Sequence, residues 1–177
     1  MILLLLLALN QEPPIDWQRA EHEIVRLVPS AFTSLPHAIT GELERRGCTI
    51  PQTWDDQRPH NVERGHFLSS KATDWIVLCS TKGKSSILVF RSGAQKPIAR
   101  IQECGDAVYL QGTLPGRAGF SRRIRAIYPE DIRGYCKLWQ HDCPAITHDG
   151  IEDIFEDKAS SILYFSGTKW LTLPGAD

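Results

Sequence analysis

Four arginines lie close together within residues 117–125, in and directly after a loop rich in glycine and proline. Residues two apart on a strand share one face, so a strand would place Arg123 and Arg125 side by side. Guanidinium groups bind carboxylates through charge-assisted hydrogen bonds. Arg117, Arg123 and Arg125 are therefore the candidates for a partner-binding surface, although a solvated face is the commoner reason for such a pattern. Two alternatives stay open: a solvated strand face, or intramolecular pairing with the acidic run at residues 152–157.

The histidines form no recognisable catalytic or metal motif, although the chain has six of them. His60 and His66 flank a short segment in which a strand would direct Glu63 and His66 to opposite faces. The chain also lacks a Gly-x-Ser-x-Gly elbow and a phosphate-binding glycine loop. We therefore assign no catalytic residue, and a non-catalytic role is favoured over that of a small extracytoplasmic hydrolase.

The five cysteines predict disulfides, because an exported chain meets an oxidising compartment. An odd count leaves one cysteine over. The preferred pairs are Cys48 with Cys79 and Cys136 with Cys143. A competing interpretation is a zinc site formed by His141, Cys143 and His148, but the paired C-x-x-C spacing of structural zinc sites is missing.

Export is predicted from the apolar run at residues 2–9, which polar residues and prolines follow at once. A bilayer span needs about 20 apolar residues, whereas the core of a signal peptide can be this short. No Lys or Arg precedes the run and no Ala-x-Ala site follows it. We expect residues 1–10 to be the remnant of a signal peptide, and a periplasmic or extracellular location. The alternative is the start of a buried strand or helix.

The amino-acid composition indicates which classes of partner are not expected, but it does not identify the partner. Twenty basic and 21 acidic residues leave a net charge of −1, so neither nucleic acid nor a membrane surface is indicated as the main partner. An unknown protein or small-molecule ligand is expected, and the oligomeric state stays open. Residues 11–177 are expected to form one globular domain, with a helical cap at 11–60 and a β-rich part at 61–177.

Helical spacing of apolar residues predicts two helices near the N-terminus. Residues 15–28 carry one apolar face, with Asp16 as N-cap. A second helix follows Ser34, with Gly47 after its end. Residues 51–60 are polar and contain prolines, which indicates a loop. A short helix is expected to begin at Pro129.

The period then changes to that of strands. Runs of β-branched and aromatic residues predict strands at 75–79, 85–90, 97–102, 107–112, 151–155, 160–165 and 169–173. Residues 81–84 fit a hairpin turn in which Gly83 adopts positive φ. Residues 113–120 are expected to form a loop. The predicted class is α+β, an antiparallel β-sheet or small sandwich with two N-terminal helices and duplicated hairpins.

Two of these strands, SSILVF at residues 85–90 and SSILYF at residues 160–165, suggest an internal repeat. If the chain contains a duplication, both should occupy equivalent strands of one sheet, each antiparallel to the strand before it. Leu88 and Leu163 should then be buried on corresponding faces, with Gly93 and Gly167 in turns. Ile87 and Val89 should share the other face with their counterparts Ile162 and Tyr164.

The segments that lead into these hairpins resemble the FG-GAP or VCBS repeats of integrin-type propellers. Gly65, Phe67 and Asp74 match in the first unit, and Asp149, Gly150 and Asp153 match in the second. The resemblance implies a calcium loop. Calcium takes six to eight oxygen ligands.

The first loop places His66, Leu68 and Ser70 at ligand positions, and these supply few oxygens. The second loop offers Thr147, Asp149 and Asp153, with the carbonyl of Ile151, so it is the calcium candidate. The alternative is that Asp74 and Asp153 bond backbone amides at the turn before each strand.

Together these patterns favour an exported, non-catalytic binding or structural module of unknown ligand. The alternatives are the hydrolase, and a secreted inhibitor or partner-binding protein that presents the arginine loop. No cofactor is expected apart from the calcium candidate.

The predicted leader gives a direct test. We expect the mature chain to begin near Asn10 or shortly after it, because the apolar run would be removed on export. Intact-mass measurement on exported material reports the N-terminus. A cytoplasmic product that retains residues 2–9 would contradict the prediction.

Overall fold

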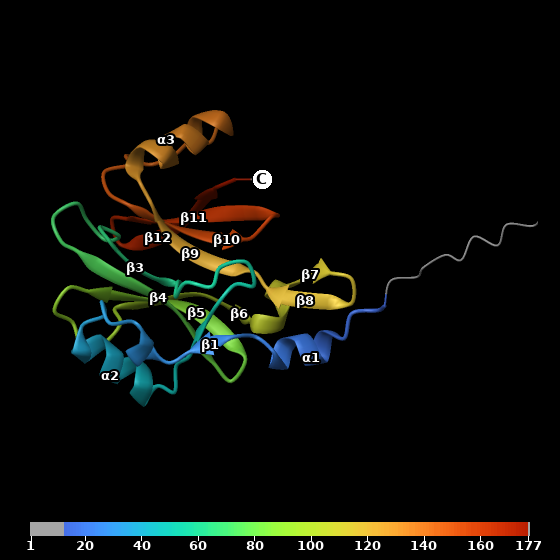
Figure 1. Ribbon diagram of the computed structural model, residues 1–177. Coiled ribbons are helices and arrows are strands. Elements are labelled where there is room, and N and C mark those ends of the chain that lie inside the picture. The colour runs from blue at the N-terminus through green and yellow to red at the C-terminus, as the bar shows by residue number, and fades with distance from the viewer. Residues whose placement is uncertain (1–12, 177) are drawn as a thin grey trace, which may run out of the picture.

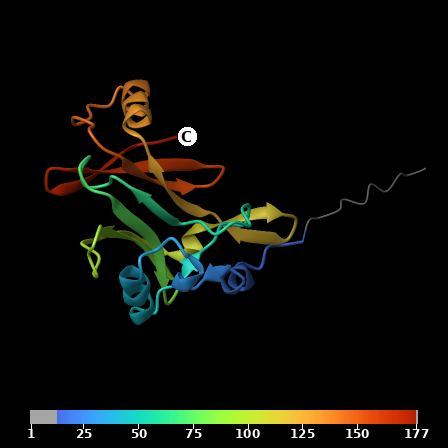
Figure 2. The same cartoon turned by 60° about the vertical axis from the view of Figure 1, so that its left-hand side comes forward.

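The computed structural model describes residues 13–176 and shows an α+β fold arranged in four layers (Figure 1). Two four-stranded antiparallel sheets face each other, and a helix covers the outer face of each. The turned view in Figure 2 shows the same order, with α2 and α3 on opposite sides of the molecule. The predicted leader at residues 1–10 lies outside the described residues.

The first half of the chain supplies the lower sheet and its helix. Its order is β3-β4-β5-β6, and the short strands β1 and β2 pair beside it. The elements are α1 (Trp17–His22), β1 (Arg26–Leu27), η1 (Pro29–Ala31), α2 (His37–Arg45), β2 (Ile50–Pro51), β3 (Val62–Gly65), β4 (Asp74–Thr81), β5 (Lys84–Arg91) and β6 (Ala99–Gly105).

The second half supplies a hairpin and the upper sheet. The hairpin β7–β8 packs against α1, and the sheet order is β12-β11-β10-β9. The elements are η2 (Asp106–Tyr109), β7 (Leu110–Leu114), β8 (Arg117–Phe120), β9 (Arg122–Ile127), α3 (Pro129–Leu138), β10 (Gly150–Phe155), β11 (Ala159–Ser166) and β12 (Lys169–Pro174).

Three apolar clusters hold the layers together. The largest lies between the sheets and contains Ile87 and Val89 from β5 and Ile151 from β10. The second joins α2 to the lower sheet, and the third joins α3 to the upper sheet through Ile132 and Tyr164. The central strands are therefore buried on both faces, which explains their long apolar runs.

Several local predictions are confirmed. Asp16 caps α1 by accepting a hydrogen bond from the backbone N–H of Arg19 at 3.0 Å. Gly47 follows α2 with φ of 66°, and Gly83 forms the predicted hairpin turn with φ of 74°. Both angles lie in the left-handed region that glycine adopts without steric cost.

Three boundaries differ from the predictions. The first helix ends at His22, because the chain then turns to form β1, where Arg26 binds the buried Asp106 at 2.9 Å. Residues 107–112 are half 3₁₀-helix and half strand. Residues 113–120 are not a loop: they contain the end of β7, a tight turn with Gly116 at φ 70°, and β8.

The prediction that the two similar stretches share one sheet is wrong, because β5 and β11 belong to different sheets. Each does pair antiparallel with the preceding strand, and Leu88 and Leu163 are both buried. Their faces do not correspond: Leu163 faces the other sheet, whereas Leu88 faces α2. Alternation alone could not identify the inner face because both faces of each strand are covered. The internal repeat itself stays a prediction.

Both predicted disulfides are confirmed. Cys48 joins Cys79 of β4 with Cα atoms 5.4 Å apart, and Cys136 of α3 joins Cys143 with Cα atoms 6.1 Å apart. Cys104 is the unpaired fifth cysteine. The first bridge ties the chain after α2 to the lower sheet, and the second fixes the segment that follows α3.

A buried arginine, which is ion-paired within the upper sheet, joins the two sheets. Arg122 of β9 has no exposed surface, and its Nε and Nη2 both donate to the Asp153 carboxylate at 2.8 Å. The same guanidinium donates to Ser85 Oγ at 3.1 Å and to the carbonyl of Gln102 at 2.9 Å, both in the lower sheet. The bonds to Asp153 lie within the upper sheet, and the bonds to Ser85 and Gln102 connect it to the lower sheet.

Replacing Arg122 by Met should leave the Asp153 carboxylate buried without a cation. We expect R122M to lower the free energy of unfolding by about 3–5 kcal/mol, and R122M/D153L to be more stable than R122M alone. Urea denaturation measures both. The matched control R91M, at an exposed position of β5, should change stability by less than about 0.5 kcal/mol. An R122M variant as stable as R91M would contradict the role of the pair.

Candidate functional site

The outer face of the upper sheet is only half covered by α3. In β9, Arg122 and Ile124 face the other sheet, so alternation directs Arg123, Arg125 and Ile127 outward. Ile127 lies under α3, within the third apolar cluster. The two arginines lie beyond that cover, beside Glu152 and Ile154 of β10, which pair with them in register.

This open half forms a cavity of about 880 Å³, which we call the charged groove. The loop at residues 55–60 and β3 form the border of the groove on the side of β9. The turn between β10 and β11 forms another border. Its lining contains six carboxylates: Asp55, Asp56, Glu63, Glu152, Glu156 and Asp157. It also contains four cations: Arg58, Arg123, Arg125 and Lys158.

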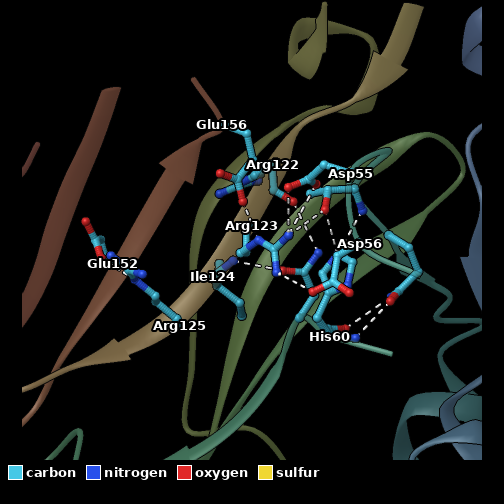
Figure 3. A network of polar contacts seen from close by, with 12 residues as sticks. Asp55, Asp56, His60, Arg122, Arg123, Ile124, Arg125, Glu152 and Glu156 are labelled. Atoms are coloured by element: carbon cyan, nitrogen blue, oxygen red, sulfur yellow. Dashed lines mark hydrogen bonds and ion pairs between the residues drawn. The ribbon is translucent and has the colours of Figure 1, made fainter. Parts of the chain in front are cut away.

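Arg123 is the centre of the ion-pair network in the groove (Figure 3). Its Nη1 donates to Asp56 at 3.2 Å, its Nη2 to Asp55 at 3.2 Å, and its Nε to Glu156. Thr53 Oγ1 accepts a further bond from Nη2 at 3.0 Å. One guanidinium is thus shared by three carboxylates, which leaves the surroundings of Arg123 acidic.

These contacts change the pKa values of the carboxyls in the groove. Hydrogen bonds from Arg58, aided by Arg123, hold the pKa of Asp56 well below its usual range. For Asp55, partial burial acts to raise the pKa, but hydrogen bonds from Thr53 and Arg123 outweigh it and the pKa is lowered. Burial raises the pKa of Glu63, although Arg123 opposes the effect. Asp55 and Asp56 therefore stay charged at low pH, whereas Glu63 takes up a proton first.

The loop that carries Asp55 and Asp56 is held by a buried histidine. His60 Nε2 accepts from the backbone N–H of Thr53 at 2.8 Å, so Nδ1 carries the proton and donates to the carbonyl of Arg58 at 2.8 Å. Gln52 accepts from the backbone N–H of His60 at 2.8 Å. Burial lowers the pKa of His60, so the ring is neutral.

A second cavity of about 560 Å³ lies between α3 and β9 and shares Arg125 and Glu152 with the charged groove. It adds two carboxylates, Glu130 and Asp131, from the first turn of α3. Tyr128, which also lines it, is exposed. The two cavities together concentrate acidic side chains on one side of a chain whose total charge is close to zero.

The predicted arginine surface is only partly assembled. Arg123 and Arg125 do share one face, but Arg117 lies on β8 and lines a separate cavity of about 580 Å³ with Trp54. The alternative of intramolecular pairing describes both groove arginines: Glu156 binds Arg123, and Glu152 binds Arg125. Both groove arginines are therefore already paired with carboxylates and do not form an open binding site for an anion.

The residues of the calcium candidate bond other groups of the protein. Both oxygens of Asp153 accept from Arg122, and Asp149 Oδ2 accepts from the backbone N–H of His66 at 2.8 Å. Thr147 donates its backbone N–H to the hydroxyl of Tyr164. Within residues 13–176 no group of three His, Cys, Asp or Glu side chains could hold a metal ion. Calcium binding by Thr147, Asp149 and Asp153 stays a prediction, and the candidate site does not depend on it.

The hydrolase alternative would gain from a shared pocket of His66, Glu63 and Asp74, but of these three only Glu63 lines the charged groove. Glu63 lines the charged groove, whereas His66 is exposed and Asp74 is fully buried. Asp74 accepts from the backbone N–H of Leu68 at 3.0 Å, as the turn-capping alternative expects, whereas Asp153 binds the side chain of Arg122.

Two features of the site escaped the sequence reasoning. Asp55 and Asp56 sit in an irregular loop without a motif, and only the fold brings them to Arg123. Arg122 carried a usable signal, because it lies two residues before Ile124 and therefore on the apolar face of the strand.

Comparison with protein-family models, curated proteins and solved structures finds no match for this chain.

His60 predicts a pH dependence of stability. Its pKa is lower in the folded state, so the unfolded chain binds the proton first as the pH falls below about 6.5. The stabilisation is therefore fully present above that pH and is lost as the pH falls through the folded-state pKa. We expect H60Q to flatten the fall in unfolding free energy as the pH is lowered from about 6.5, measured by urea denaturation.

The control for this prediction is H141Q, since His141 is exposed. It should keep the wild-type pH dependence. An H60Q variant whose stability changes with pH as steeply as that of the wild type would show that His60 is not the titrating group.

Proposed function

We propose that this protein is a non-catalytic binding module, and that its charged groove takes a cationic segment of a partner polypeptide. The observation that carries the proposal is the surplus of carboxylates on the open half of the β9–β12 sheet. Opposite charges attract across a groove of low-dielectric walls, and this raises both the encounter rate and the specificity.

The pattern of pairing supports a cationic occupant. The groove arginines are occupied by carboxylates of the chain itself, so an anion would have to break these pairs. A cation, in contrast, can approach Glu63 and Asp157, for which no ion pair is formed within residues 13–176. The volume of about 880 Å³ is that of a ligand pocket and accommodates several side chains.

The same pairing speaks for binding over catalysis. General acid–base catalysis needs a group whose proton can be exchanged near the working pH. Asp55, Asp56 and Glu156 are held in ion pairs, and His60 uses both ring nitrogens to shape the loop. A hydrolase is the second candidate, and the raised pKa of Glu63 in the groove is the observation that favours it.

Export is part of the proposal. The two disulfides fit an oxidising compartment, where such bonds persist. No helix within the described residues is long and apolar enough to cross a membrane.

The proposal predicts binding of a short basic peptide. We expect the wild-type protein to bind acetyl-tetra-arginine amide and not acetyl-tetra-glutamate amide, measured by isothermal titration calorimetry. Binding should weaken as salt is raised to about 0.3 M, because surface charges are then screened. E63Q and D157N should each weaken binding by about two- to tenfold.

The matched control is E44Q, which removes the same charge from exposed α2 on the opposite side of the molecule (Figure 2). It should bind as the wild type does. Failure of the wild-type protein to bind the basic peptide, or an equal loss in E44Q, would refute the groove as the site. Equal binding of spermidine and the peptide would replace the polypeptide partner by a small polyamine.

A further inference from the structure

Glu152 is a buried carboxylate that two cavities share. Its residue is 1% exposed, and it lines both the charged groove and the cavity beside α3. Oε1 accepts from Ser160 Oγ at 2.7 Å, and Oε2 accepts from Arg125 Nε at 2.6 Å. The hydroxyl of Ser160 thus orients the carboxylate, and Arg125 supplies its only cation within residues 13–176.

Arg125 differs from the other two arginines of β9. The side chain of Arg122 has no exposed surface and that of Arg123 is 18% exposed, whereas that of Arg125 is 59% exposed. Arg125 makes one side-chain hydrogen bond, and Arg122 and Arg123 make several each. Of the three, Arg125 is the easiest to move, because a solvated guanidinium regains water when it leaves.

The carboxylate cannot lose its cation without replacement. A buried charge that is left unpaired is strongly unfavourable, and a guanidinium from outside can take the same position. The side chain of Arg125 also demonstrates that the site accepts a guanidinium. The pair is therefore suited to exchange, with the buried partner fixed and the exposed partner free to swing away.

We propose that Glu152 is the anchor for an arginine side chain of the bound segment, and that Arg125 is an internal occupant that this side chain displaces. The inference rests on the proposed function and assigns a specificity-determining residue within the same groove. It explains why a buried acid faces two cavities while its cation comes from the surface. It also makes affinity a competition between the chain's own arginine and that of the partner.

The test removes the internal competitor. R125A should bind acetyl-tetra-arginine amide about tenfold tighter than the wild type, measured by calorimetry at low salt. R117A is the matched control, because it removes the same charge from exposed β8, outside the groove, and it should bind within about twofold of the wild type. In R125A the peptide should also raise the melting temperature by more than it does in the wild type.

The second variant identifies the anchor. R125A/E152Q should lose the gain and bind at least about tenfold more weakly than R125A. If R125A folds poorly, R125Q, whose amide can still donate to Glu152, should show the same tightening to a smaller degree.

The outcomes separate this inference from the proposed function. If the wild type binds but R125A binds no tighter than R117A, the exchange is refuted and the groove stays the site. If R125A/E152Q binds as tightly as R125A, Glu152 is not the anchor. If R125A binds and the wild type does not, the groove of the unaltered protein is refuted as the binding site, and this inference, which rests on it, falls as well. If neither binds, both proposals fall.

Discussion

The arrangement of the two sheets depends on one buried guanidinium, that of Arg122. Arg122 has no contact with solvent, so each of its donors must find an acceptor inside the protein, and these acceptors come from β5, β6 and β10. The ring of Tyr109 lies over the same guanidinium, 4.7 Å from its Cζ atom to the ring centroid. A purely apolar interface would permit the sheets to slide. The fork of a guanidinium permits one register, and we infer that specificity of packing is its main contribution.

The position of Arg122 decides what the other face of β9 can do. Successive side chains of a strand point to opposite faces. Because Arg122 and Ile124 point toward the lower sheet, Arg123 and Arg125 point to the outer face. Asn61 reinforces this register, because its side chain donates to the carbonyl of Arg122 at 3.1 Å and accepts from the backbone N–H of Ile124 at 2.8 Å. Asn61 adopts φ of 70°, a conformation that asparagine tolerates better than most residues. The groove is therefore a consequence of the inter-sheet core.

Local signals in the sequence predicted local structure well. Cap residues, turn glycines and the short Cys136–Cys143 loop each act over a few residues, and the structure has them as expected. Signals that depend on the surroundings failed. The strands at 85–90 and 160–165 are apolar on both faces, so the sequence could not tell which face meets the other sheet or that two sheets exist. Residues 15–28 kept helical spacing, but Arg26 gains a buried ion pair by leaving the helix.

The candidate site was predictable only where it follows strand alternation. Arg123 and Arg125 could be placed on one face, and the acidic residues 152–157 could be named as their complement, because both sets lie on strands or in the turn that joins two strands. Asp55 and Asp56 could not be placed, since a loop of irregular backbone carries them to Arg123 across almost 70 residues of sequence.

The sequence also did not indicate that the exposure of the arginine side chains increases along β9. Three arginines of one strand are fully buried, mostly buried and mostly exposed, and their ion pairs range from structural to exchangeable. A stable fold and an adaptable binding surface can therefore share one strand, because burial, and not residue type, sets what each arginine does.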